Sequence, residues 1–190
     1  RWKDIISRLY FPYSEEEMFQ ACLDVVKANE LEDCYIRPLI YIVDGGWNLL
    51  NVDVKLEYSV AAWKWDKYMG EDAVNHGIRA KISSFTRHHI NAAMTKAKVS
   101  GNYVNSVLAK SEVVKQGYDE AILLDANGHI SECTGQNLFV VRKGRLTTPP
   151  SYSILEGITR DSVIELASDL GYETHETVLT RDQLYIADEI

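Results

Sequence analysis

Residues 120–170 are the part of this chain that most limits which folds are possible. Four short apolar runs there have the composition of strands, at residues 120–124, 129–133, 137–142 and 145–148. Asn127-Gly128 and Lys143-Gly144 connect two pairs of these runs, and both dipeptides favour tight hairpin turns. A helix is predicted next, over about residues 159–170, with Gly171 as its C-terminal stop. The segment therefore predicts a strand meander followed by a helix, in a fold that mixes α and β structure.

The rest of the chain also alternates between helices and strands. Ser14-Glu15-Glu16-Glu17 has the spacing of a capping box and begins a helix predicted to end near Asn29. Thr180-Arg181-Asp182-Gln183 has the spacing of a second capping box. Further strands are predicted over residues 34–43, 58–65, 78–85 and 173–179. Another helix is predicted over residues 102–116, and its apolar periodicity places five residues on one face: Val104, Val107, Leu108, Ser111 and Val114.

The change of pattern near residue 70 indicates two domains. We expect residues 1–70 to belong to a small N-terminal domain, residues 71–80 to connect the domains, and residues 81–190 to form a larger one. Residues 1–10 have the pattern of a helix in progress, and residues 187–190 resemble the start of a strand. We therefore expect the chain to be a window of a longer polypeptide.

Composition excludes several classes of protein. The net charge is −8 over 190 residues, whereas nucleic-acid-binding domains favour a basic surface. No apolar run reaches the length of a membrane span, and no signal peptide is visible. The three cysteines are odd in number, and no pair has a zinc-ligand or redox spacing. We expect reduced thiols in a cytoplasmic protein that binds neither nucleic acid nor membrane.

Two features of the 120–170 segment suit a phosphorylated heteroaromatic ring. Glu132 follows a predicted strand, and a carboxylate beside a pyridine nitrogen keeps that ring protonated. Gly157-Ile158-Thr159-Arg160 opens a helix, where free backbone N–H groups suit a phosphate. A strand-end glutamate and an ordinary helix cap are the plainer alternatives for the same residues.

Lysine and tyrosine residues upstream complete the candidate site. Lys98 lies between Ala97 and Val99, and a lysine forms a Schiff base with a carbonyl cofactor only when some of its amine is neutral. Lys96 is two residues away, and the spacing alone does not choose between the two lysines. Tyr103 follows Lys98 by five residues and could donate to a phenolate oxygen. Solvated lysines and a half-buried tyrosine remain the plain alternatives.

Tyr35 and Arg37 alternate along a predicted strand, so their side chains share a face. Arginine is well suited to bind a carboxylate, although surface positions would explain both residues equally. The adjacent His88 and His89 point apart in an extended segment and make a poor chelate, so we predict no metal site.

Taken together, these motifs resemble those of the class IV (fold-type IV) pyridoxal-phosphate aminotransferases, and among them the branched-chain amino acid aminotransferases. The resemblance rests on residues 132–160, on Ala97-Lys98-Val99-Ser100-Gly101-Asn102-Tyr103, on Tyr35-Ile36-Arg37-Pro38 and on Tyr185-Ile186-Ala187-Asp188-Glu189. It implies a two-domain α+β / α/β fold, with a small α/β N-terminal domain and a larger mixed-sheet C-terminal domain, truncated at both ends. It covers essentially the whole chain.

The resemblance also implies the role of each candidate residue. Lys98 would be the catalytic residue, bound to pyridoxal 5′-phosphate and moving the substrate's α-proton. Glu132 would pair with the pyridine nitrogen and Tyr103 with the phenolic oxygen. The remaining roles are implied for groups of residues: cofactor binding for Asn137, with Ile158 and Thr159 on the phosphate, and substrate binding for Tyr35, Arg37 and Tyr68.

On this basis we expect an enzyme that transfers the amino group between leucine, isoleucine or valine and 2-oxoglutarate. The apolar loop at residues 47–52 corresponds to one that reaches the partner's site, which implies a homodimer. The family's N-terminal phosphate-binding arginine and the Ser-Gly-Thr turn after Glu189 are absent from this sequence, and Gln136 stands where relatives often have an acid.

Three alternatives remain open at the level of the sequence. A D-amino acid aminotransferase and an aminodeoxychorismate lyase share the same fold, although Lys-Val-Ser-Gly-Asn-Tyr and Tyr-Ile-Arg favour the branched-chain enzyme by resemblance. A truncated, non-catalytic relic that serves as a binding or scaffold protein is a third, because fold alone does not settle function.

Overall fold

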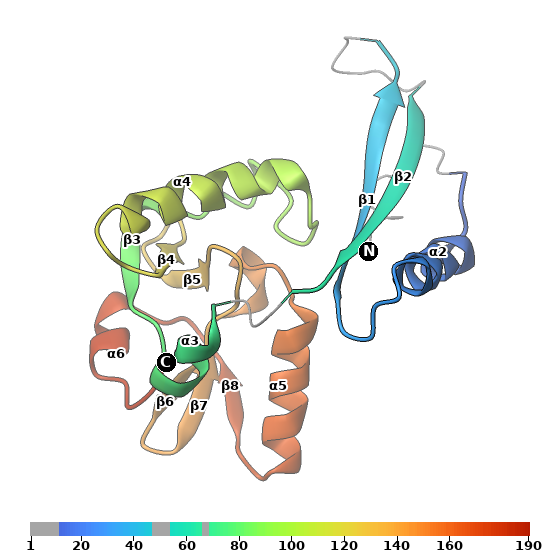
Figure 1. The fold of residues 1–190 in the computed structure, drawn as a ribbon. Coiled ribbons are helices and arrows are strands. Elements are labelled where there is room, and N and C mark those ends of the chain that lie inside the picture. The colour runs from blue at the N-terminus through green and yellow to red at the C-terminus, as the bar shows by residue number, and fades with distance from the viewer. Residues whose placement is uncertain (1–11, 47–53, 66–68) are drawn as a thin grey trace. The chain divides into compact units, whose positions relative to one another are not determined.

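The computed structural model describes residues 12–46, 54–65 and 69–190, and its chain divides into two compact units, Arg1–His76 and Gly77–Ile190 (Figure 1). The predicted helix at residues 1–10, the loop at residues 47–52 and Tyr68 lie outside the described residues. Assigning these units to the two expected domains, and the connecting role to residues 71–80, stays a prediction.

In its described residues, unit 1 contains a helix beside a long two-stranded ribbon, followed along the chain by a short helix (Figure 1). Helix α2 (Glu15–Ala28) begins with the predicted capping box, in which the Glu17 N–H donates to Ser14 Oγ at 3.1 Å and the Ser14 N–H donates to Glu17 Oε2 at 2.7 Å. Strands β1 (Tyr35–Asp44) and β2 (Lys55–Trp63) pair antiparallel, and α3 (Glu71–His76) ends the unit.

The first sheet of unit 2 has the strand order β3-β4-β5. Strand β3 (Ala80–Thr86) runs parallel to β4 (Glu120–Leu124), which pairs antiparallel with β5 (Ile130–Cys133) across the predicted Asn127-Gly128 turn. A parallel pair needs a long crossover, and α4 lies in the chain between β3 and β4 to provide it.

The second sheet has the order β6-β7-β8. Strands β6 (Val140–Arg142) and β7 (Arg145–Thr148) form the predicted hairpin, with φ of 49° at Lys143 and 73° at Gly144, as a two-residue turn of type I′ requires. Strand β8 (Thr174–Glu176) runs parallel to β7 and is shorter than predicted.

The prediction of one continuous meander was therefore wrong, because the chain leaves the first sheet after Cys133. The Cys133 N–H donates to the Gln136 carbonyl at 2.8 Å, which closes a turn on itself. Beyond it, the side chains of Thr134 and Asn137 bond to the carboxylates of Glu120 and Glu132. Buried carboxylates need such donors, and residues 134–137 supply them instead of continuing the strand.

Helix α4 (Tyr103–Val114) follows the short helix η1 (Ser100–Asn102) and packs on β3 and β4 through the side opposite to the predicted apolar face. Ala109 and Val113 are fully buried against Ala121 and Leu123, whereas Val104 and Val107 are each 62% exposed. Small residues at the contact let the helix approach the sheet closely, so residue size outweighs apolar periodicity here.

The remaining helices complete unit 2. Helix α5 (Ile158–Asp169) confirms the predicted second helix of this region, and α6 (Arg181–Tyr185) begins with the predicted capping box at Thr180. A short helix, η2 (Ser151–Ser153), precedes α5. The main apolar core of the unit lies between the sheets and α6: Ile122, Ile130, Leu138, Val140, Leu179 and Leu184. Within the described part of the chain, no helix could span a membrane.

Candidate active site

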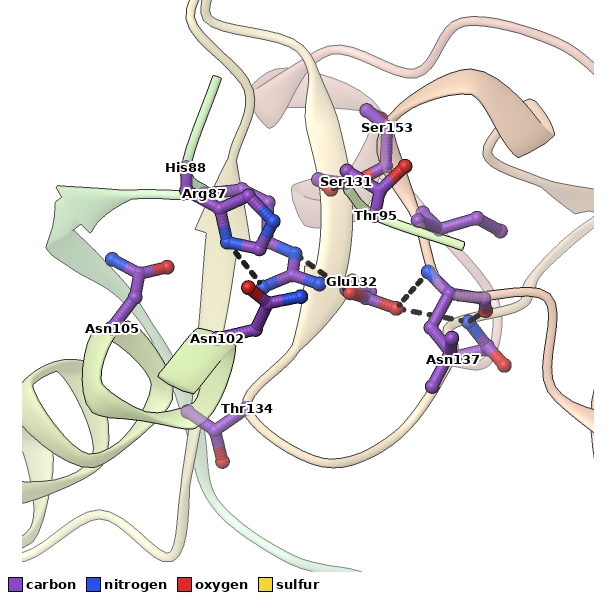
Figure 2. Close-up of polar contacts among 12 residues, drawn as sticks. Arg87, His88, Thr95, Asn102, Asn105, Ser131, Glu132, Thr134, Asn137 and Ser153 are labelled. Carbon is purple, nitrogen blue, oxygen red and sulfur yellow. Dashed lines mark hydrogen bonds and ion pairs between the residues drawn. The ribbon is translucent and has the colours of Figure 1, made fainter. Parts of the chain in front are cut away.

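The carboxylate of Glu132, at the end of β5, is buried and contacts Arg87 and Asn137 (Figure 2). Only 6% of the residue is exposed. Arg87 Nε lies 2.7 Å from Oε1, while the side-chain amide of Asn137 and the Leu155 N–H each donate to Oε2 at 3.1 Å. Burial raises the pKa of Glu132, and the charge of Arg87 and the Leu155 N–H act against that rise.

Arg87 was not among the predicted site residues, although it is the closest charged partner of Glu132. It directly follows β3, its N–H donates to the Leu124 carbonyl at 2.7 Å, and its residue is 7% exposed. Its Nη1 also lies 2.9 Å from Nδ1 of His88, whose pKa is lowered by burial and by the Arg87 charge. A neutral His88 can accept from the guanidinium through Nδ1, so the order Glu132, Arg87, His88 forms a polar chain (Figure 2).

Asn137 connects Glu132 to the loop that precedes α5. Its side-chain NH₂ donates to Glu132 Oε2 and, at 2.9 Å, to the Leu155 carbonyl. Its Oδ1 lies so close to Gly157 that a Cβ built at residue 157 would be 2.3 Å away. The structure thus gives Asn137 a bracing contact, whereas its predicted contact with the cofactor stays a prediction.

The N-terminus of α5 has no side-chain cap, unlike that of α2, and its N-cap residue is Gly157. Ile158 is 85% exposed and Thr159 is exposed, so the backbone N–H groups of this first turn are accessible. Arg160 fixes the turn from beneath, because its Nη2 donates to the Pro149 carbonyl at 3.2 Å and to Glu176 Oε2 at 2.7 Å. An accessible helix start of this kind suits an anion.

The two candidate lysines differ sharply in their contacts. Nζ of Lys96 donates to the carbonyls of Ser151 and Ile154 and lies 3.0 Å from Glu156 Oε1. Lys98 is exposed and makes no hydrogen bond or ion pair within the described residues; its Nζ lies 5.5 Å from the centre of the Tyr103 ring. The amine of Lys98 is therefore available for chemistry, and that of Lys96 is not.

Tyr103 is half-buried at the first position of α4, beyond η1. Asn102 fixes the turn that carries Lys98, because its side-chain amide donates to the Met94 carbonyl at 3.0 Å and to the Ala97 carbonyl at 3.1 Å. These bonds keep Lys98 and Tyr103 together on one short stretch of chain.

A second buried carboxylate supports the same region. Glu120, fully buried in β4, receives a bond from Lys110 Nζ at 2.9 Å and from the Thr134 hydroxyl at 2.5 Å. Cys133 directly follows Glu132 in the chain. Burial, together with the charges of Glu120 and Glu132, raises the pKa of the Cys133 thiol to about 12.

Two of the predicted substrate residues, Tyr35 and Arg37, belong to an aromatic cluster in unit 1. Arg37 Nη2 donates to the Tyr35 hydroxyl at 3.2 Å, and its guanidinium lies 5.2 Å from the Tyr35 ring and 5.8 Å from the Trp63 ring. Tyr35 and Trp63 face each other in the β1–β2 register, and Trp65 lies 4.6 Å from Tyr35 by ring centroids. The same-face prediction for Tyr35 and Arg37 is consistent with their direct contact.

The comparisons with known proteins identify the family. A family model described as "Amino-transferase class IV" matches residues 1–190. The chain belongs to the class IV aminotransferase family. The family recognised from the sequence is thereby confirmed.

Two curated relatives carry the same name. The chain is 42% identical over 184 residues to the branched-chain-amino-acid aminotransferase of Pseudomonas aeruginosa, covering 97% of this chain and 60% of the relative. It is 46% identical over 187 residues to that of Escherichia coli K12, covering 95% and 60%. The chain thus spans about three fifths of the length of these curated relatives.

Solved structures give the same family and fold. The crystal structure of the Escherichia coli branched-chain amino acid aminotransferase matches with a TM-score of 0.94 and 44% identity, over 98% of this chain and 62% of that one. The Thermobaculum terrenum branched-chain amino acid aminotransferase in its PLP form matches with a TM-score of 0.88 and 38% identity, over 98% and 60%. The fold-type IV architecture expected from the sequence is confirmed.

Among the described residues, the structure shows no group of three side chains able to hold a metal ion. In unit 2 it connects Glu132, Asn137 and the start of α5 through direct contacts, and it places Lys98 beside Tyr103. A signal in the sequence could have identified Arg87 as a site residue. Arg87 directly follows the strand that became β3, and the acidic Glu132 lies at the end of the strand that became β5.

Proposed function

We propose that the whole protein is a pyridoxal 5′-phosphate-dependent aminotransferase that exchanges the amino group between branched-chain L-amino acids and 2-oxoglutarate. The observation that carries the proposal is the contrast between Lys98, whose amine makes no hydrogen bond or ion pair among the described residues, and Glu132, whose carboxylate is buried and held. Relatives named branched-chain-amino-acid aminotransferases support it and favour this function over the D-amino acid and lyase alternatives.

The hydrogen-bond count at Glu132 is compatible with the cofactor. A carboxylate offers about four acceptor positions. Oε2 uses two of them for Asn137 and Leu155, and Oε1 forms the ion pair with Arg87. One position on Oε1 is left for the N–H of a protonated pyridine ring. Arg87 and the Leu155 N–H also favour the ionised carboxylate that such a ring needs.

The other proposed cofactor contacts come from the start of α5 and from the segment that carries Lys98 and Tyr103. The free N–H groups of Ile158 and Thr159 at the start of α5 would bind the phosphate. Tyr103 would donate to the phenolic oxygen. When bound, the cofactor supplies a protonated ring that withdraws electrons from the α-carbon of the substrate. Lys98 would then take the proton from that α-carbon and deliver it to C4′ of the cofactor.

Substrate binding is proposed for unit 1. Arg37 would bind the distal carboxylate of glutamate and 2-oxoglutarate, with Tyr35 and Tyr68 beside it. In the structure, the Tyr35 hydroxyl accepts one hydrogen bond from Arg37, and the Trp63 ring lies 5.8 Å from the guanidinium. Such partners would let the same pocket accept an apolar side chain without leaving a buried charge unpaired. A homodimer and a cytoplasmic location complete the proposal.

The first experiment records the absorbance of the purified protein with pyridoxal phosphate, before and after leucine. We expect an absorbance band from the Schiff base between the protein and the cofactor. Adding leucine should replace this band with that of pyridoxamine phosphate. Borohydride reduction followed by mass spectrometry then locates the lysine attached to the cofactor. We expect attachment at Lys98, its loss in Lys98→Ala, and its retention in Lys96→Met. Attachment at Lys96, or equal loss in both variants, would refute the assignment of Lys98.

A further inference from the structure

We propose that Lys96 is a positioning residue that holds the loop at residues 151–156 against Glu132 and so sets the start of α5. The proposal about the loop stands on contacts within unit 2. Its consequence for catalysis rests on the proposed function.

The ammonium of Lys96 has all three of its donor positions used by one loop. A lysine ammonium carries three N–H groups and accepts nothing. Two acceptors are the carbonyls of Ser151 and Ile154, the latter at 3.3 Å, and the third is Glu156 Oε1 at 3.0 Å. The loop therefore wraps around this single charge.

The contacts of Lys96 fall on both sides of Leu155 in the chain. Leu155 is the residue whose N–H donates to Glu132 Oε2 and whose carbonyl accepts from Asn137. Because Lys96 binds Ile154 before it and Glu156 after it, Lys96 fixes the direction of the Leu155 N–H. Glu132 thus receives its backbone donor from a loop that Lys96 holds in place.

Neighbouring contacts also hold the loop at residues 151–156, but they do not replace the contacts of Lys96 with Ile154 and Glu156. The Ser131 hydroxyl donates to the Ser153 carbonyl at 2.8 Å, and the Tyr152 hydroxyl donates to Asp125 Oδ2 at 2.8 Å. Both lie before Leu155. After it, Lys96–Glu156 and the close approach of Asn137 to Gly157 are among the contacts that lead into α5. Removing Lys96 therefore loosens the section between Leu155 and α5 most.

The position of Lys96 in the chain connects its contacts with residues 151–156 to the candidate active site. Lys96 precedes Lys98 by two residues, so the bonds of Lys96 join the segment that carries Lys98 to the loop that carries Leu155. The charged groups that face Glu132 are Arg87 and Lys96, with the Cys133 thiol next in the chain. Lys96 therefore supports the ionised carboxylate as well as its backbone donor.

The test uses the protein without cofactor, so it does not depend on the proposed function. Amide hydrogen exchange at Leu155 is measured by NMR in wild type and in Lys96→Met, with Lys81→Met as the control. Lys81 is also half-buried and bonds to Gln116, far from the loop in the chain. Loss of a charged hydrogen-bond donor predicts exchange at Leu155 about tenfold faster in Lys96→Met, and no change in Lys81→Met.

A second readout separates positioning from general loosening. Carbon-13 NMR of the glutamate carboxyl groups, assigned with Glu132→Gln, follows the titration of Glu132. We expect the pKa of Glu132 to rise in Lys96→Met and to stay unchanged in Lys81→Met. Leu155 exchange and Glu132 titration that both match wild type would overturn the proposal.

Glu156→Gln keeps the proposal testable if Lys96→Met does not fold. This variant leaves Lys96 and its two carbonyl contacts in place and removes only the ion pair. Leu155 exchange about two- to fivefold faster is expected, in keeping with a half-exposed ion pair. An unchanged rate would refute the role of Lys96–Glu156. Failure of the wild-type protein to bind pyridoxal phosphate, with the exchange results as expected, would overturn the proposed function. The positioning role of Lys96 would still stand.

Discussion

Replacement of Arg87 by leucine tests whether Glu132 is held as an ion pair. The two side chains are 7% and 8% exposed, so the change leaves a buried carboxylate without its cation. Breaking a buried pair costs about 3–5 kcal/mol. Because Asn137 and Leu155 still donate to Glu132, we expect the lower end, about 3 kcal/mol of unfolding free energy for unit 2.

The assay is urea denaturation at pH 7, followed separately in the two units. All four tryptophans, at positions 2, 47, 63 and 65, belong to unit 1, so their fluorescence serves as an internal control. Backbone amide exchange in β4 and β5 reports on unit 2. With a urea dependence of about 1–3 kcal/mol per molar, the midpoint of unit 2 should fall by about 1–3 M. The tryptophan transition should not move.

The pH dependence gives a second, sign-specific check. Burial already raises the pKa of Glu132 in the folded protein, and loss of Arg87 raises it further. A carboxyl whose folded pKa is raised contributes stability below its unfolded pKa and loses it as pH rises through the folded value. The deficit of Arg87→Leu should therefore shrink at acidic pH, and Arg87→Leu with Glu132→Gln should recover stability at pH 7. A deficit under about 1 kcal/mol at pH 7, or a double variant no more stable than the single one, would refute the ion pair.

Two further predictions concern neighbouring residues. Gly157→Ala should lower the unfolding free energy by about 1–3 kcal/mol and loosen Glu132. The new methyl group meets the Asn137 side chain, which two hydrogen bonds hold in place. Gly101→Ala is the matched control in thermal unfolding, because a Cβ at residue 101 meets nothing within 4 Å. Cys133 should resist iodoacetamide at pH 8 in the folded protein, since a thiol pKa of about 12 leaves on the order of one thiolate in ten thousand. Mass spectrometry before and after unfolding in urea checks this, and rapid labelling of the folded protein would contradict it.

Local signals in the sequence were sufficient for most secondary structure. The capping boxes at Ser14 and Thr180 and the Lys143-Gly144 turn depend on residues a few positions apart, and the structure confirms each of them. The strand pairing around residues 133–140 was not predictable in the same way. It depends on Glu120, which receives the Thr134 hydroxyl from fourteen residues further along the chain.

The burial of α4 shows the same limit. The periodic apolar residues suggested one face, yet Ala109 and Val113 make the contact with the sheet while Val107 is 62% exposed. A helix that crosses a sheet closely needs small side chains at the contact, and the sequence does not say which face meets the sheet. Hydrophobic periodicity alone therefore chose the wrong side.

The choice between the two lysines shows what the fold adds to the chemistry. Lys96 and Lys98 lie in the same short stretch, and both suit a covalent bond to a carbonyl group. The fold separates them by what lies opposite each ammonium. Three oxygen acceptors from residues 151–156 surround Lys96, whereas Lys98 meets the face of Tyr103. Acceptors more than fifty residues further along the chain thus distinguish the two lysines. We propose that Lys96 holds the loop at residues 151–156 in place and that Lys98 reacts with the cofactor.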